Sequence, residues 1–304
     1  MIESVKIIEQ MLRDNAFDRS VLINILDSMS FTPIVPVMLP AGNKILRSST
    51  NDEFEFHKSI SRLNYPPAQF ARTDRTSLKN KPMFYGSVFT SAAKTENGYP
   101  RIFSALETTD ILRDYNLKGR VITTQSVWMT QNDIFTFAFP YPNDMPRACD
   151  EIKSIRKMWD AKKTKFKQEE VEFMEYIGEI MTMKAYSCLY DITANVVDYI
   201  LSHIRFMDRP LDGVYYPSVW GVGAGVNICL KPDVVDRCVQ FVDAKLVVID
   251  KNVGESFLPI VADSRLDDDG VLQWTANQYT LSLFKDAYGF KDVVAVDDGI
   301  VGIR

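Results

Sequence analysis

The sequence predicts a protein of the α+β class, in which helical and strand-forming stretches occupy separate parts of the chain. Residues 1–28 have an amphipathic helical pattern, residues 82–89 and 121–139 are rich in aromatic and β-branched residues, and residues 146–206 follow a helical pattern again. Helices and strands do not alternate regularly along the chain. A doubly wound parallel sheet requires such alternation, so that architecture is not expected.

The first part of the chain is expected to place two helices before the first strand. Residues 1–28 divide into two short helices, and Asp18 has the position of an N-cap for the second one. Residues 31–42 contain three prolines, which favours an extended or loop conformation. We expect a strand at 44–48 and irregular structure at 50–82, where polar residues and prolines are frequent.

The later elements follow from local pattern in the same way. Ser104 and Glu107 have the S-x-x-E spacing of a capping box, which predicts a helix that begins at Ser104 and extends to residue 114. A glycine-rich turn is expected at 221–225. Loop structure is expected at 90–100, and further strands at 121–129, 134–139, 214–219 and 226–230, followed by β-rich segments at 238–262 and 271–283.

Composition and charge narrow the range of functions. The net charge of −5, with lysines and acids interspersed, argues against a nucleic-acid-binding protein. No apolar run reaches the roughly 18 residues of a membrane helix, and the N-terminus lacks the apolar region of a signal peptide. The four cysteines form no C-x-x-C pair, so we expect free thiols and a cytoplasmic location.

Histidine is scarce, which restricts the possible catalytic machinery. The chain has only His57 and His203, and this disfavours zinc proteases and most Ser-His-Asp hydrolases. The acidic segment 263–270 lacks the spacing of a calcium loop and is better explained as a polar turn. No metal site is therefore expected.

Three positions have side chains suited to binding a phosphorylated or sugar-containing ligand. Arg75 precedes a loop that enters a strand and could clamp a phosphate with its planar fork, while Tyr85 on that strand could stack on an aromatic ring. The alternative is a surface arginine and a core tyrosine. Glu107 could hydrogen-bond a ribose hydroxyl and stabilise a positive sugar carbon, or it could serve only the capping box of Ser104.

Ser218 ends a predicted strand beside the glycine-rich turn, a position from which a side chain can contact a ligand. The turn could equally be a simple hairpin connection. It is not a GxGxxG dinucleotide-binding motif, because it leads into a strand instead of a helix. A nucleophilic Ser218 is disfavoured, since no histidine lies near it in the sequence.

Taken in order, these segments resemble the RES family, which is named for an arginine, a glutamate and a serine. The matching segments are 44–115 and 212–240, about a third of the chain. The motif positions are Arg75, the P-x-x-Y element from Pro82 to Tyr85, Glu107, the element Tyr216-Pro217-Ser218, Asn227 and Pro232.

The resemblance implies an α+β fold with a mixed sheet similar to that of ADP-ribosyltransferase-like toxins. It implies destruction of NAD+ by phosphorolysis or hydrolysis; some members are ADP-ribosyltransferases, and many are toxins inhibited by an Xre-type antitoxin. NAD+ would be the substrate, inorganic phosphate could be a co-substrate, and no other cofactor is implied. An inactive binding protein on the same fold is the remaining alternative.

The resemblance also assigns roles and boundaries. Residues 1–43 would be an N-terminal helical segment, and residues 44–304 a RES-like catalytic domain with a helical insertion at about 146–206. The family's earlier arginine could be Arg47 or Arg62, and Arg47 is preferred because its segment is strand-like. The implied catalytic residues are Arg75, Glu107 and Ser218, and the implied NAD+-binding residues are Arg47, Arg75, Tyr85, Tyr216, Ser218 and Asn227.

Overall fold

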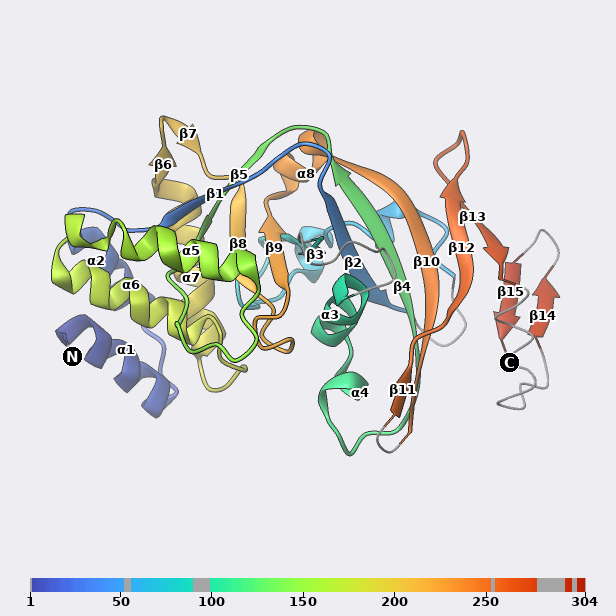
Figure 1. Cartoon of the computed structure of the whole chain (residues 1–304), viewed down its shortest axis with the longest axis horizontal. Coiled ribbons are helices and arrows are strands. Elements are labelled where there is room, and N and C mark those ends of the chain that lie inside the picture. The colour runs from blue at the N-terminus through green and yellow to red at the C-terminus, as the bar shows by residue number, and fades with distance from the viewer. Residues whose placement is uncertain are drawn as a thin grey trace.

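An 11-stranded mixed sheet runs through the computed structural model, which describes residues 2–51, 56–89, 99–252, 255–277, 293–296 and 300–303 (Figure 1). With the helices that pack beside it, this sheet confirms the α+β class. The strands of the sheet are, in spatial order, β1 (Val35–Leu39), β5 (Ile134–Ala138), β8 (Gly213–Pro217), β9 (Val226–Leu230), β3 (Phe84–Val88), β2 (Lys44–Thr50), β4 (Gly119–Thr130), β10 (Val239–Asn252), β12 (Ile260–Leu266) and β13 (Leu272–Ala276), with β11 (Glu255–Phe257) paired to β10.

Short antiparallel ribbons complete the strands of the described residues. They are β6 (Arg205–Phe206) with β7 (Arg209–Pro210), and β14 (Val293–Val296) with β15 (Ile300–Ile303). The strands predicted from residue 44 to residue 230 are confirmed, and β10, β12 and β13 confirm the β-rich segments as far as residue 277. Most of the loop predicted at 90–100 and the segment after residue 277 lie outside the described residues.

The parallel pairing of two strands explains why a long helical section lies between them in the sequence. Strands β5 and β8 are parallel, with Thr136 opposite Gly213, whereas the other pairs of the sheet are antiparallel. Parallel neighbours require a long crossover instead of a tight turn. The crossover contains α5 (Asp150–Asp160), η3 (Lys163–Lys165), α6 (Gln168–Ile180) and α7 (Leu189–His203). The helical pattern predicted for 146–206 is therefore confirmed, and it connects two neighbouring strands.

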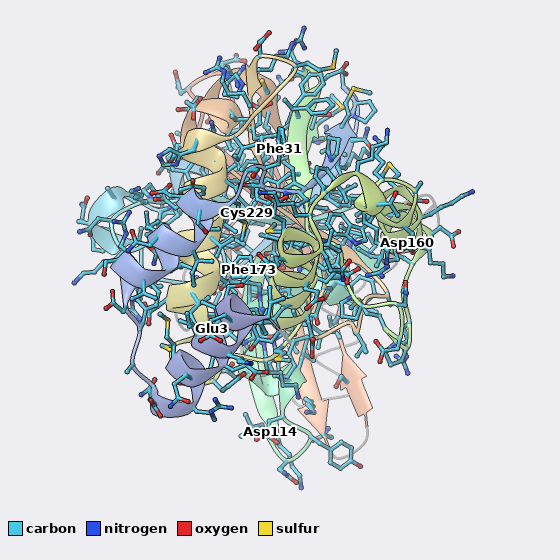
Figure 2. All side chains as sticks on the ribbon, turned by 90° about the vertical axis from the view of Figure 1, so that its left-hand side faces the viewer. Glu3, Phe31, Asp114, Asp160, Phe173 and Cys229 are labelled. Carbon is cyan, nitrogen blue, oxygen red and sulfur yellow. The ribbon has the colours of Figure 1, made fainter. Side chains whose placement is uncertain are left out.

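The N-terminal helices pack against this crossover. Helix α1 (Glu3–Asp14) contacts α6, and α2 (Arg19–Ser28) contacts α7. The predicted cap of α2 is confirmed, since Asp18 accepts hydrogen bonds from the backbone N–H groups of Ser20 at 2.8 Å and Val21 at 3.2 Å. These helices gather at one end of the molecule, and Figure 2 looks onto that end, with Glu3 on α1 and Phe173 on α6.

A single hydrophobic cluster joins the helical end to the sheet. It includes Ile8 and Leu22 of the N-terminal helices, Trp159 and Phe173 of the crossover, and Phe137 of β5. Burial of each such side chain contributes roughly 1.5–3 kcal/mol. Because β1 also pairs with β5, residues 1–43 share the sheet and the core of the following segment. The boundary at residue 43 stays a prediction.

The predicted start of the helix that carries Glu107 is wrong. The described helix α3 extends over Tyr99–Thr108, so Ser104 lies inside it and Glu107 lies in its last turn. The S-x-x-E spacing therefore forms no capping box. Proline is tolerated in a first helical turn. Helix α3 packs on β2 and β3, and its Phe103 and Ala105 are buried. Tertiary packing thus sets the position of this helix.

The remaining described elements are short. They are η1 (Ile60–Arg62), η2 (Ala68–Phe70), α4 (Asp110–Arg113) and α8 (Pro232–Cys238). The first two interrupt an otherwise irregular segment, as predicted for 50–82 in its described part. No helix among the described residues has the length and apolar character needed to cross a membrane. Within the same residues, all four cysteines are free thiols, and Cys229 and Cys238 are buried as expected.

Candidate active site

A cavity of about 650 Å³ lies where the glutamate helix, the central strands and the loop before β3 meet. Its volume falls within the range of small-molecule sites, roughly 300–1,000 Å³. Six of the seven residues assigned by the resemblance line it, and the seventh, Ser218, is fully buried in contact with one of them. The six are Arg47, Arg75, Tyr85, Glu107, Tyr216 and Asn227.

Glu107 is held by hydrogen bonds to one of its two carboxylate oxygens. The Ser218 hydroxyl donates to Oε1 at 2.7 Å, and the Asn227 side-chain amide donates to the same oxygen at 3.1 Å. The Ser218 oxygen accepts from the backbone N–H of Gly221 at 3.1 Å, which leaves its own proton for Glu107. Among the described residues, Oε2 has no hydrogen-bond partner. One oxygen is therefore anchored, and the other is available to a ligand.

Asn227 is itself oriented by Ser87, a residue that the sequence did not single out. The Ser87 hydroxyl donates to Oδ1 of Asn227 at 2.8 Å, so the amide nitrogen must point toward Glu107. Strand register brings these residues together, because Asn227 on β9 lies opposite Ser87 on β3 and opposite Tyr216 on β8. A serine in a strand carries no local signal of this role.

The turn that carries Ser218 is packed tightly against α3. The backbone N–H of Ser218 donates to the Gly225 carbonyl at 2.9 Å, which closes the hairpin between β8 and β9. A Cβ atom at Gly225 would lie 2.2 Å from Phe103 Cδ2, and one at Gly221 would lie 2.7 Å from Phe103 Cδ1. These glycines therefore allow the turn to approach the helix of Glu107. The turn leads into a strand, as predicted, and not into a helix.

Arg47 is the early arginine that lines the cavity, whereas Arg62 is exposed and does not. Its Nη1 donates to the Tyr85 carbonyl at 3.0 Å, and its guanidinium lies 5.6 Å from the centre of the Phe84 ring. Its Nε is buried and has no hydrogen-bond partner among the described residues. Burial lowers the pKa of Arg47 to about 10, which leaves it charged at neutral pH. A half-buried cation with a buried, unused donor favours an anionic ligand.

Arg75 is a buried residue, so the alternative of a surface arginine is wrong. Its Nη1 donates to the Met181 carbonyl at 2.7 Å, and Nη2 donates to the Tyr190 hydroxyl at 3.3 Å. The guanidinium also lies 5.1 Å from the centre of the Tyr190 ring. Arg75 therefore connects the cavity wall to the crossover, and part of its hydrogen-bonding capacity is used within the protein.

The two assigned tyrosines contribute neutral aromatic surface. Burial holds the pKa of both Tyr85 and Tyr216 well above the ordinary value, so neither acts as a base at neutral pH. The Tyr85 hydroxyl accepts from Thr76 at 2.9 Å and donates to Ser77 at 2.9 Å. Its hydrogen bonds are satisfied by the protein, and its ring borders the cavity.

Arg113 is a further cavity residue that sequence reasoning missed. Its side chain donates to the backbone carbonyls of Leu106 and Glu107, which covers the C-terminal end of α3. Its guanidinium lies 5.1 Å from the centre of the Trp220 ring, and Lys184 Nζ lies 4.5 Å from the same centre. An arginine just after a helix is a recognisable signal of a C-terminal cap. The signal can be used only when the end of the helix is predicted correctly from the sequence.

The charges around the cavity favour an anionic ligand. Four arginines line it, Arg47, Arg72, Arg75 and Arg113, against the two carboxylates of Asp74 and Glu107. The lining therefore has an excess of positive charge, which attracts phosphate groups. Across the described residues, no group of three or more histidine, cysteine, aspartate or glutamate side chains is arranged to hold a metal ion.

The sequence matches no protein-family model and no curated protein. The similarity to the RES family therefore depends on the motif residues alone.

Proposed function

We propose that this chain is an enzyme that consumes NAD+ by cleaving the bond between nicotinamide and ribose. The observation that carries the proposal is the state of Glu107, whose Oε1 accepts from Ser218 and Asn227 while Oε2 is free among the described residues. This carboxylate borders a cavity with an excess of arginine. We also propose that the mixed sheet belongs to the ADP-ribosyltransferase-like kind that the RES resemblance implies.

The chemistry of the reaction suits these residues. As the C–N bond to nicotinamide breaks, the ribose carbon takes on oxocarbenium character. A fixed carboxylate oxygen close to that carbon stabilises the developing positive charge. Nicotinamide leaves as a neutral molecule, because the bonding electron pair neutralises its ring nitrogen. No general acid is needed for its departure, and Glu107 is the residue assigned to charge stabilisation.

The acceptor completes the balance of the reaction. If water attacks the ribose carbon, the products are nicotinamide, ADP-ribose and one proton. If inorganic phosphate attacks, its oxygen forms the new bond and the product is ADP-ribose phosphorylated at that carbon. Arg47 and Arg75 are assigned to the phosphate groups of substrate or acceptor, and Tyr85 to the nicotinamide end. Ser218, which was expected at the same end, is buried outside the cavity lining and holds Glu107 instead.

The test is to incubate the purified chain with NAD+, with and without added phosphate. The release of nicotinamide is measured over time by chromatography. Release accelerated by phosphate indicates a phosphorylase, and release independent of phosphate indicates a hydrolase. Label from adenylate-labelled NAD+ that becomes attached to protein would instead indicate an ADP-ribosyltransferase. A folded sample that releases no nicotinamide under any of these conditions would contradict the proposal.

A further inference from the structure

A second, smaller hollow adjoins the candidate active site across the side chain of Phe70. Its volume is about 340 Å³, and it shares Phe70, Ala71, Arg72 and Thr73 with the larger cavity. The residues that belong to the hollow alone are Gln69 and Lys79. A ligand that fills both spaces would therefore pass Phe70.

Phe70 is exposed although its backbone is well fixed. The short helix η2 holds this segment, with hydrogen bonds from Phe70 N–H to the Pro67 carbonyl at 2.9 Å and from Ala71 N–H to the Ala68 carbonyl at 3.1 Å. Ala71 is buried, whereas 68% of Phe70 is exposed. Among the described residues, the Phe70 ring has no aromatic or cation–π partner. The ring is thus an open flat surface at the mouth of the cavity.

Two exposed charged side chains lie beside Phe70. Arg72 and Lys79 are exposed, and neither side chain has an ion pair or hydrogen bond within the described part of the chain. Lys81, two residues further on, shows the contrast, because its Nζ contacts Asp198 at 2.7 Å. Among the described residues, no carboxylate lines the hollow. Two exposed cations next to an exposed aromatic ring suit a ligand that is both anionic and aromatic.

We propose that this hollow is the subsite for the purine end of the dinucleotide. The adenine ring stacks on Phe70, and the Gln69 amide lies within the same hollow to hydrogen-bond the base edge. Arg72 and Lys79 contact the diphosphate from the side of the adenine, in addition to the arginines of the larger cavity. This inference rests on the proposed function, because the nicotinamide end of the same molecule would occupy the cavity at Glu107. Phe70 would then be the residue that makes the enzyme prefer a dinucleotide to nicotinamide mononucleotide.

The experiment measures the binding of ADP by calorimetry to the wild-type chain and to three variants. Phe70→Ala removes the ring and is expected to weaken ADP binding by roughly 5- to 100-fold, as for the loss of base stacking on an aromatic side chain. Phe70→Trp keeps a stacking surface and should bind ADP within about threefold of the wild type. Phe31→Ala is the matched control, since Phe31 is 69% exposed but lies at the helical end of the molecule (Figure 2).

Kinetics supply a second readout on the same proteins. Phe70→Ala should raise the KM for NAD+ by a similar factor and leave the KM for nicotinamide mononucleotide unchanged, because that substrate lacks adenosine. Equal ADP affinity of Phe70→Ala and the wild type would overturn the subsite, as would a wild type that does not bind ADP. A chain that binds ADP through Phe70 but releases no nicotinamide would support the subsite and contradict the proposed function.

Discussion

Ser218 donates a 2.7 Å hydrogen bond to Glu107 from a position 111 residues away in the sequence. The contact joins the hairpin between β8 and β9 to the last turn of α3. Because the Gly221 N–H occupies the serine oxygen, the hydroxyl proton is directed at the carboxylate. Ser218 is therefore placed to position Glu107.

Ser87 is predicted to be a positioning residue that acts through Asn227. Ser87→Ala removes the bond that orients the Asn227 amide, so the amide can rotate and present its oxygen to Glu107. We expect kcat for NAD+ cleavage to fall by about 10-fold or more, with little change in KM, because misplacement of a catalytic group is costly. Stability should fall by roughly 1–3 kcal/mol, since a buried acceptor loses its partner.

Ser264→Ala is the matched control for this variant. Ser264 on β12 is also buried, but its hydroxyl has no hydrogen-bond partner among the described residues. Its removal should leave both kcat and the free energy of unfolding in urea nearly unchanged. If Ser87→Ala behaves like Ser264→Ala in steady-state kinetics, the positioning role is wrong.

Arg47 is predicted to bind the ligand and to lower the stability of the protein when no ligand is bound. Arg47→Met replaces a half-buried cation, whose buried Nε has no hydrogen-bond partner among the described residues, by an apolar side chain of similar length. We expect its free energy of unfolding to equal or exceed that of the wild type by roughly 1 kcal/mol. Addition of ADP-ribose should raise the melting temperature of the wild type and not that of Arg47→Met. An equal shift of the melting temperature in both proteins would show that Arg47 does not contact the ligand.

Arg113 is predicted to stabilise the end of α3 and the position of Glu107 together. Arg113→Ala exposes the carbonyls of Leu106 and Glu107 and removes the contact with Trp220. We expect a loss of about 1–2 kcal/mol in urea unfolding and a lower kcat. Arg113→Lys keeps the charge but not the planar fork and should recover only part of either quantity. Full activity of Arg113→Ala would show that the position of Glu107 does not depend on this residue.

Gly225 is predicted to be intolerant of any side chain because of Phe103. A Cβ atom would lie 2.2 Å from the Phe103 ring, so Gly225→Ala should cost roughly 1–3 kcal/mol through overpacking. The double variant with Phe103→Leu should recover part of this loss, since the two residues share one space. Additive losses in the double variant would contradict the proposed contact.

Local sequence patterns were sufficient for much of this fold. The Asp18 cap and the strands at 44–48 and 226–230 depend on near neighbours in the chain, and the structure contains them. The start of α3 could not be predicted from Ser104 and Glu107, because burial against β2 and β3 overrides the capping-box spacing. The parallel pairing of β5 and β8 is a long-range feature with no local signal.

In the candidate site, too, some residues could be predicted from the sequence and others depend on long-range contacts. Glu107, Ser218 and Asn227 were selected from motif order, and the structure brings them within hydrogen-bonding distance. Ser87 was missed because its role arises from strand register, and Arg113 was missed because the end of α3 was misplaced. Arg75 lines the cavity, but its bonds to Met181 and Tyr190 depend on the crossover and could not be predicted from its neighbours in the sequence.

The most direct test of the proposed chemistry is the turnover of Glu107→Gln with saturating NAD+, measured by nicotinamide release beside the wild type. Glutamine has the same size and can still accept from Ser218 and Asn227, so the free energy of unfolding should change by less than about 1 kcal/mol. Loss of the negative charge should lower kcat by roughly 100-fold or more. A stable Glu107→Gln protein that cleaves NAD+ at the wild-type rate would contradict the assignment of Glu107 as the group that stabilises the ribosyl cation.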